Sequence, residues 1–176
     1  MKTHAYALMG THYHFSIQVK SLNDILNHIS SLPNGQRTVI MNNLVNNLNS
    51  EDDLLNKLII NQFQNFQNSY AKSINKQLGR HGSLFQKKFK RSIFNPEIKF
   101  RYLQYYIHHN ARKHGLVKNF KEHRFISYHE IINGSSEFID LEGVMNHFQD
   151  LDAFKKFHHT IHFEEVFKNI DIENIF

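Results

Sequence analysis

The sequence predicts a mixed α and β protein in which two short strands precede several helices. Three observations lead to this prediction. Apolar and polar residues alternate over Tyr13 to Val19, which is the period of a strand with two different faces. Apolar residues recur every three or four positions from Leu55 to Ile74, which is the period of an amphipathic helix. The chain of 176 residues, 40% of them hydrophobic, is long enough to bury a core.

Two strands are predicted over Ala5 to Met9 and Tyr13 to Val19, with a break at Gly10-Thr11. Because successive side chains of a strand point to opposite faces, His12 and His14 project side by side from the second strand. Two imidazoles held in this way can bind a divalent cation. The same pattern also fits two polar residues on a solvated strand face, so the pair alone does not establish a metal site.

Helices are predicted for much of the remaining chain. Ser21 caps a short helix, and residues 36 to 49 carry apolar residues at helical spacing. The longest helix starts at Ser50, where a hydroxyl and the following acidic residues suit a helix N-terminus, and it ends at Gly79. Tyr70 lies on its apolar stripe, so we expect this tyrosine in the core.

A last helix is predicted from Pro96 to about Lys113. Tyr106 and Asn110 are four residues apart within it, so they lie on one helical face at the border of the apolar stripe. A tyrosine nucleophile beside an amide whose oxygen can ligate a metal would need such an arrangement. Spacing alone does not distinguish Tyr106 from the neighbouring Tyr and His residues of this helix.

A basic stretch lies between residues 72 and 91 and contains no acidic residue. Phe85 and Phe89 are interleaved with its charges, as in grooves that bind a phosphate backbone while bases stack on aromatic rings. We predict a phosphate-binding loop there, followed by a strand over Lys90 to Phe94. The candidate DNA-binding residues are Lys72, Lys76, Arg80, Lys87, Lys88, Lys90 and Arg91.

Charge is distributed unevenly along the chain. Residues 1 to 136 hold 18 Lys and Arg against 7 Asp and Glu, whereas residues 137 to 176 hold 3 against 9. A basic body with an acidic tail indicates a polyanionic partner, of which nucleic acid is the obvious example. The chain has no Cys, which excludes disulfides, thiolate metal sites and cysteine nucleophiles. No segment is typical of a signal peptide or a membrane span, so we expect a cytoplasmic protein with no membrane partner.

Four sequence blocks lie in order along nearly the whole chain. They are residues 5 to 14, residues 69 to 76 with 79 to 91, residues 106 to 117, and residues 125 to 128. They resemble, in that order, the AYxLMPNHxH segment, the middle block, the YIHxNPVxxGLV block and the xSSY block of the HUH single-tyrosine transposases. The resemblance is closest to the REP-associated tyrosine transposases and their insertion-sequence relatives.

The resemblance implies a ferredoxin-like or RRM-like fold, with a central antiparallel sheet and helices packed on it. It also implies a DNA transposition enzyme that cleaves and rejoins single-stranded DNA through a 5′-phosphotyrosine intermediate. In that enzyme His12, His14 and Asn110 would hold Mg²⁺ or Mn²⁺, and Tyr106 would be the nucleophile. The partner would be single-stranded DNA containing hairpins, and the pattern fits a monomer as well as a homodimer.

The chain departs from the family pattern at its start. Family members have a further strand and helix before the AYxLM segment, whereas this chain begins almost directly on it. Loss of a strand would leave unpaired backbone at a sheet edge. We therefore expect an N-terminally truncated catalytic domain over residues 1 to 128, followed by an acidic helical appendage over residues 129 to 176. An upstream start, a partner that fills the gap and a decayed copy all remain open.

Two other functions are compatible with the same residues. A non-catalytic nucleic-acid-binding remnant of a transposase would need only the basic stretch and would survive Tyr106→Phe. A metal phosphodiesterase that uses water would need His12 and His14 and would leave no covalent adduct on the protein.

Overall fold

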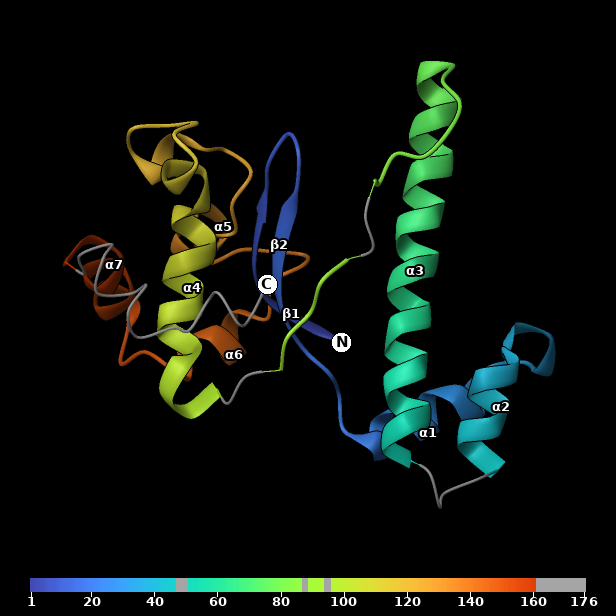
Figure 1. Ribbon diagram of the computed structural model, residues 1–176. Helices are drawn as coiled ribbons and strands as arrows, with labels where there is room; N and C mark the ends of the chain where they lie inside the picture. Colours follow the sequence, from blue (N-terminus) through green and yellow to red (C-terminus); the bar gives the residue numbers. More distant parts are fainter. Residues whose placement is uncertain (47–50, 87–88, 94–95, 161–176) are drawn as a thin grey trace. The chain divides into compact units, whose positions relative to one another are not determined.

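The computed structural model describes residues 1–46, 51–86, 89–93 and 96–160 of the chain. The chain divides into two compact units, each with its own hydrophobic core. The first unit combines Met1–Val19 with the chain from Lys90 onward, and the second consists of Lys20–Phe89. Figure 1 labels the elements of both units. The first unit is therefore discontinuous in sequence, because the second is inserted between its two segments.

The first unit begins with an antiparallel hairpin of β1 (Lys2–Leu8) and β2 (Tyr13–Gln18). Both predicted strands are confirmed. The register pairs Ala5 with Ser16 and Ala7 with His14, so these four side chains share one face of the hairpin. This is the only sheet among the described residues, and its two strands make it smaller than the central sheet that the resemblance implies.

The face of the hairpin that carries the histidines is covered by α4 (Pro96–Lys113) rather than by solvent. Ala5, Ala7 and Ser16 are buried there, and His14 contacts the helix through Tyr106. The small side chains leave room for α4 to lie close to the strands. The polar face of β2 therefore points toward the protein interior, whereas its aromatic residues lie half-buried on the opposite face.

The other edge of β1 is paired by residues from later in the chain. Leu8 N donates to the Phe125 carbonyl at 2.9 Å, and Ser127 N donates to the Tyr6 carbonyl at 3.1 Å. Further along the edge, Asp140 N donates to the Thr3 carbonyl at 2.8 Å. Later segments of this chain therefore form hydrogen bonds with many of the backbone groups on the edge of β1 that faces away from β2.

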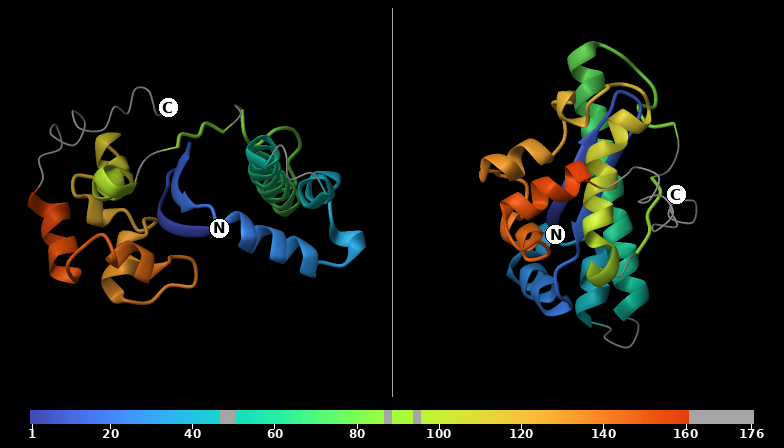
Figure 2. Two further views of the ribbon diagram at one scale, coloured as in Figure 1. Left: turned by 90° about the horizontal axis from the view of Figure 1, so that it is seen from below. Right: turned by 90° about the vertical axis from the view of Figure 1, so that its left-hand side faces the viewer.

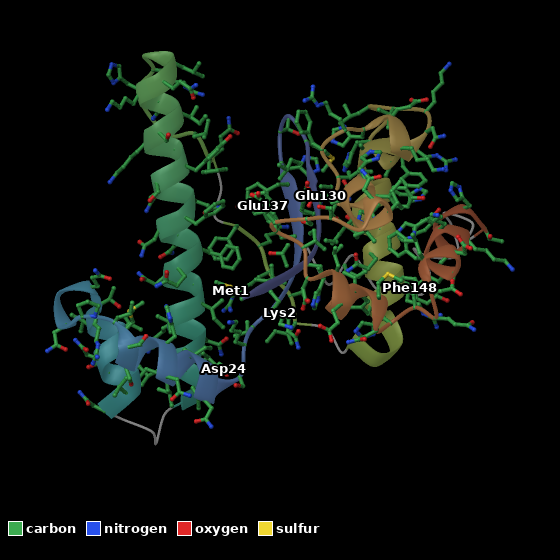
Figure 3. The ribbon with its side chains drawn as sticks, turned by 180° about the vertical axis from the view of Figure 1, so that it is seen from behind. Met1, Lys2, Asp24, Glu130, Glu137 and Phe148 are labelled. Atoms are coloured by element: carbon green, nitrogen blue, oxygen red, sulfur yellow. The ribbon has the colours of Figure 1, made fainter. Side chains whose placement is uncertain are left out.

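Short helices complete the first unit. They are the 3₁₀ helix Phe120–Glu122, α5 (Tyr128–Asn133), α6 (Leu141–Met145) and α7 (Leu151–Thr160). In Figures 1 and 2, α4 lies between the hairpin and α7. Figure 3 shows Glu130 of α5 beside the hairpin, where the hydroxyls of Tyr6 and Ser136 donate to its carboxylate. The described residues of the predicted acidic appendage, 129–160, thus belong to the same compact unit as α4.

The second unit is helical and consists of α1 (Leu22–Ser31), the 3₁₀ helix Asn34–Gln36, α2 (Val39–Asn46) and α3 (Glu51–Leu78). The predicted cap is confirmed, since the Ser21 hydroxyl accepts from Asp24 N at 3.2 Å. The core forms where α1 and α2 pack on the N-terminal part of α3, around Ile29, Leu44 and Leu58. Ser50, the predicted cap of α3, lies outside the described residues.

The prediction of a core position for Tyr70 is wrong. The C-terminal half of α3 extends past the part that α1 and α2 cover (Figure 1), and the side chains of Phe66 and Tyr70 are 53% and 49% exposed. The apolar stripe of α3 is longer than the surface available to bury it.

The predicted strand over Lys90 to Phe94 is wrong for its described residues. Residues 89–93 have no regular secondary structure and belong to no sheet among the described residues. The Ile93 side chain is 91% exposed, although it would need a buried face in a strand. Phe94 lies outside the described residues. The mixed α and β class is nevertheless confirmed.

Candidate active site on the hairpin and helix α4

The hairpin and α4 bring together two pairs of residues that lie far apart in the sequence. The rings of His12 and His14 meet at 87° with centroids 5.3 Å apart. The His14 ring meets the ring of Tyr106 on α4 at 80°, with centroids 5.6 Å apart. Asn110, one helical turn beyond Tyr106, influences the pKa of both His14 and Tyr106 through its side chain. The structure therefore places the predicted ligands and the predicted nucleophile in one cluster.

The end of α4 adds a third imidazole to this cluster. His114 lies one helical turn beyond Asn110, and its ring meets that of His12 at 79° with centroids 4.8 Å apart. The helix stops immediately afterwards at Gly115, which has a φ of +69°. Gly115 N donates to the Arg112 carbonyl and Leu116 N to the Ala111 carbonyl, which is the hydrogen-bond pattern of a Schellman cap. This cap fixes His114 at the last turn.

Burial keeps His14 neutral. Burial is the largest of the causes that lower the pKa of His14 to about 4, and charge repulsion from the nearby His12, His114 and Lys113 contributes to the shift. A neutral imidazole has the lone pair that a metal ligand needs. His12 is engaged at Nδ1, which lies 2.9 Å from the Thr11 hydroxyl, so Nε2 is its candidate ligand atom.

Tyr106 is almost fully buried, and burial raises the pKa of its phenol. The hydrogen-bonding influence of Asn110 opposes this shift. The Lys113 ammonium lies over the Tyr106 ring, 5.2 Å from the centroid. Burial lowers the pKa of Lys113 as well. The phenol is thus protonated at neutral pH, and a cation stands where it can stabilise negative charge as it develops.

The buried amide of Asn110 is chemically suited to be a metal ligand. Its side chain is fully buried, yet neither Oδ1 nor Nδ2 makes a well-formed hydrogen bond within the described part of the chain. An amide oxygen that makes no well-formed hydrogen bond and lies beside two imidazoles fits the donor set of a divalent cation. Across residues 1–46, 51–86, 89–93 and 96–160, no three His, Cys, Asp or Glu side chains form a group that could hold a metal. The predicted ligand set adds the Asn110 oxygen to the two imidazoles.

The neighbouring tyrosine and histidine of α4 have a different environment. Tyr105 stacks on His109 with ring centroids 3.9 Å apart, and both are buried in the core. His108 is fully buried and contacts Ser127 and His158. The ring stacking and hydrogen bonds of these side chains place them within the packed interior between α4 and α7. Geometry thus separates Tyr106 from residues that spacing could not distinguish.

The candidate DNA-binding residues are divided between the two units. Lys72, Lys76 and Arg80 lie in the second unit, on the C-terminal half of α3 and just after it, and all three are exposed. Lys90 and Arg91 are exposed in the first unit. The predicted residues Lys87 and Lys88 lie outside the described residues.

Sequence reasoning missed two residues of the cluster, Lys113 and His114. The signal was present, because Tyr106, Asn110 and His114 are spaced at successive intervals of four and so share one helical face. The helix was predicted to end at about Lys113, so His114 lay outside the predicted element. Helix-face spacing, continued through the last turn, would have included His114.

Comparison with protein-family models, with curated proteins and with solved structures finds no match. None of the helices in the described residues combines the length and the apolar character that crossing a membrane requires. The case for a function therefore rests on the chemistry of the cluster and on the sequence blocks that contain it.

Proposed function

We propose that this protein cleaves and rejoins single-stranded DNA with Tyr106 as its nucleophile, as a HUH single-tyrosine transposase does. The observation that supports this most is the meeting of His14 on β2 with Tyr106 on α4. Two further groups that the reaction needs, the His12 imidazole and the buried amide of Asn110, lie in the same cluster. In this proposal the β-hairpin of the protein belongs to a ferredoxin-like HUH domain. The substrate is single-stranded DNA in the cytoplasm that contains DNA hairpins.

His12, His14 and Asn110 would hold Mg²⁺ or Mn²⁺. A bound ion of this kind polarises the scissile phosphate and stabilises charge on its oxygens. Both ions favour oxygen donors, but Mn²⁺ is a transition metal and accepts nitrogen ligands more readily than Mg²⁺ does. A site with two imidazoles and one amide oxygen should therefore prefer Mn²⁺ to Mg²⁺. His14 is ready for this role because its imidazole is already neutral at physiological pH.

Tyr106 carries the covalent step. Its Oη forms a bond to the phosphorus, and the bond from phosphorus to the 3′ oxygen breaks. The phenol loses a proton and the departing 3′ oxygen gains one. The upstream DNA fragment therefore ends in a 3′-hydroxyl, and the downstream fragment stays attached to the protein through its 5′ phosphate. Lys113 favours this step because its cation lies against the ring that becomes negatively charged.

The test is formation of a covalent adduct. The full chain is incubated with labelled single-stranded DNA that carries imperfect hairpins, with Mn²⁺ or Mg²⁺ and then with chelator, and separated under denaturing conditions. We expect a metal-dependent protein–DNA band that Tyr106→Phe removes. Tyr105→Phe is the matched control, since it deletes the hydroxyl of the adjacent, core-stacked tyrosine and should keep the band. An adduct that persists in Tyr106→Phe would contradict the assignment.

Two outcomes would favour the other functions. Metal-dependent cleavage that leaves no adduct and survives Tyr106→Phe would indicate a phosphodiesterase that uses water. Binding of several hairpins without cleavage, by a protein shown to be folded, would indicate a nucleic-acid-binding remnant. The exposed cations Lys72, Lys76 and Arg80, which do not depend on the cluster around Tyr106, support this second candidate.

A further inference from the structure

A groove of about 600 Å³ lies between the C-terminal half of α3 and the loop that follows this helix. Its helical wall includes Gln67, Asn68, Ala71 and Lys72, and Phe85 lines it from the loop. A second cavity of about 350 Å³ shares Lys72 with the groove and adds Lys76 and Arg80. Both lie within the second unit. The groove thus combines amides, one aromatic ring and a border of cations.

The loop that forms the outer wall is held against the helix by specific bonds. Asn75 Nδ2 donates to the Gly82 carbonyl at 2.8 Å. Gly79 and Gly82 have φ values of +62° and +92°, so the chain can reverse direction and return alongside α3, as Figure 1 shows. Within the described residues, the buried Asn75 Oδ1 has no hydrogen-bond partner. An acceptor in the groove wall is therefore left unsatisfied.

The lining suits a nucleotide better than it suits an apolar ligand. Amide side chains such as Gln67 and Asn68 offer both donors and acceptors, which match the edge of a nucleobase. The ring of Phe85 lies beside that of Tyr70, with centroids 6.3 Å apart, and Tyr70 is half exposed. Exposed or groove-lining aromatic rings of this kind serve as stacking platforms for single-stranded bases.

The charge around the groove points to an anionic ligand. Lys72, Lys76 and Arg80 border it, and the sequence contains no acidic residue between Asp53 and Glu97. Cations that track a backbone beside aromatic rings are the recurring design of single-strand binding sites. A duplex keeps its bases stacked, so only a single strand can place a base in such a groove.

We infer that this groove is a subsite for one unstacked nucleotide of single-stranded DNA. The base lies against Phe85 with its edge on Gln67 and Asn68, and the phosphates on either side lie on Lys72 and Arg80. The inference rests on the proposed function. It identifies a base-contacting surface on α3 and the loop that follows it, whereas Tyr106 lies on α4. It accounts for the amides of the groove, which a surface that binds only phosphate would not need.

Fluorescence anisotropy with the full chain in the presence of chelator tests the subsite. Two labelled single strands of equal length are compared, one intact and one in which abasic sites replace the bases but keep the phosphates. Because stacking on one aromatic side chain is worth about 1–3 kcal/mol, we expect the intact strand to bind roughly tenfold more tightly. Equal affinity of wild-type protein for the two strands would overturn the base subsite and leave DNA binding intact.

Substitution of Ala71 locates the effect. Ala71→Leu fills the groove without changing charge, and leucine is accepted in a helix. It should remove most of the preference for the intact strand. Ser69→Leu is the matched control, since Ser69 is an exposed position of the same helix that does not line the groove. A preference that Ala71→Leu leaves unchanged would exclude the groove as its source.

A second variant distinguishes loss of the groove from misfolding of the Ala71→Leu protein. The double substitution of Gln67 and Asn68 by alanine removes the amides without adding bulk, and it should reduce the same preference. Circular dichroism checks that each variant is folded. If folded wild-type protein binds neither strand, both the subsite and the proposed DNA partner fall. If it forms the Tyr106 adduct but shows no base preference, only the subsite falls.

Discussion

His108 and His158 are joined by a hydrogen bond of 2.8 Å between Nδ1 of the first and Nε2 of the second. His158 Nδ1 lies 2.9 Å from the Phe154 carbonyl, which can only accept, so His158 carries its proton on Nδ1. His108 therefore donates from Nδ1, and its Nε2 accepts from the Ser127 hydroxyl at 2.8 Å. This chain of neutral groups ties α7 to α4 and to the segment that pairs with β1.

We expect the stability of the protein to fall as the pH drops from about 6.5 toward 4. Burial lowers the pKa of His158 to about 4 and the pKa of His108 well below its ordinary value of 6.5. In this range the unfolded chain binds protons that the folded chain does not. Each of these histidines therefore removes up to about 1.4 kcal/mol of unfolding free energy per pH unit.

Urea denaturation across this pH range measures the effect. His158→Gln should flatten the slope of unfolding free energy against pH, whereas His28→Gln at an exposed position should leave it unchanged. A wild-type slope near zero between pH 6.5 and 4 would contradict the neutral state of the buried pair.

Loss of His12 should abolish metal-dependent cleavage. His12→Ala removes one of the two imidazoles that would hold the ion, and isothermal titration with Mn²⁺ should show weaker binding by at least about tenfold. His81→Ala is the control, because His81 is exposed and lies in the second unit. Intact cleavage by a His12→Ala protein would exclude this residue as a ligand.

Removal of the charge on Lys113 should slow adduct formation. The ammonium lies 5.2 Å from the centroid of the Tyr106 ring, and a cation–π contact of an exposed lysine is worth about 0.5–1 kcal/mol. We expect the initial rate for Lys113→Gln to fall by roughly threefold, and Lys113→Arg to retain most of it. Lys118→Gln, at an exposed position beyond the helix, should react at the wild-type rate. A Lys113→Gln protein that reacts at the same rate would show that the cation does not assist.

Gly143→Ala should destabilise the first unit. A Cβ at this position in α6 would lie 2.5 Å from Asp140 Oδ2 and 2.9 Å from His4 Nε2. It would displace the carboxylate that Lys2, at the start of β1 (Figure 3), contacts at 2.8 Å. Overpacking of this kind costs about 1–3 kcal/mol.

Chemical denaturation measures this cost, and Gly35→Ala provides the comparison. A Cβ at Gly35 would meet no atom within 4 Å, so this variant should keep the wild-type stability to within about 1 kcal/mol. If Gly143→Ala unfolds at the same urea concentration as wild type, the packing around Asp140 is looser than the structure indicates.

Local patterns predicted the elements that depend on neighbours in sequence. The hairpin strands, the Ser21 cap and the bounds of α4 follow from alternation, capping chemistry and Pro96, and the structure has all of them. The expectations for Tyr70 and for Lys90 to Phe94 concerned tertiary partners instead. A stripe or a strand is buried only if another surface reaches it, and sequence periodicity does not reveal how far α1 and α2 extend along α3.

In the candidate site, too, local sequence patterns predicted some features, whereas others depend on tertiary packing. The pairing of His12 with His14 and of Tyr106 with Asn110 follows from the periods of a strand and a helix. Their meeting depends on which face of the hairpin α4 covers, and this face is the one that carries the buried Ala5 and Ala7. The apolar face of β2 would have been the natural guess for the buried one.

The discontinuous first unit has a consequence for how the chain folds during synthesis. The hairpin leaves the ribosome before α4, which covers its histidine face and follows only after all of Lys20–Phe89. Closing so long a loop costs entropy that the hairpin's own contacts do not offset, and a two-stranded hairpin alone is marginal in water. The nascent hairpin therefore waits for its partner helix, while the inserted helices, whose contacts are local, can fold in the meantime.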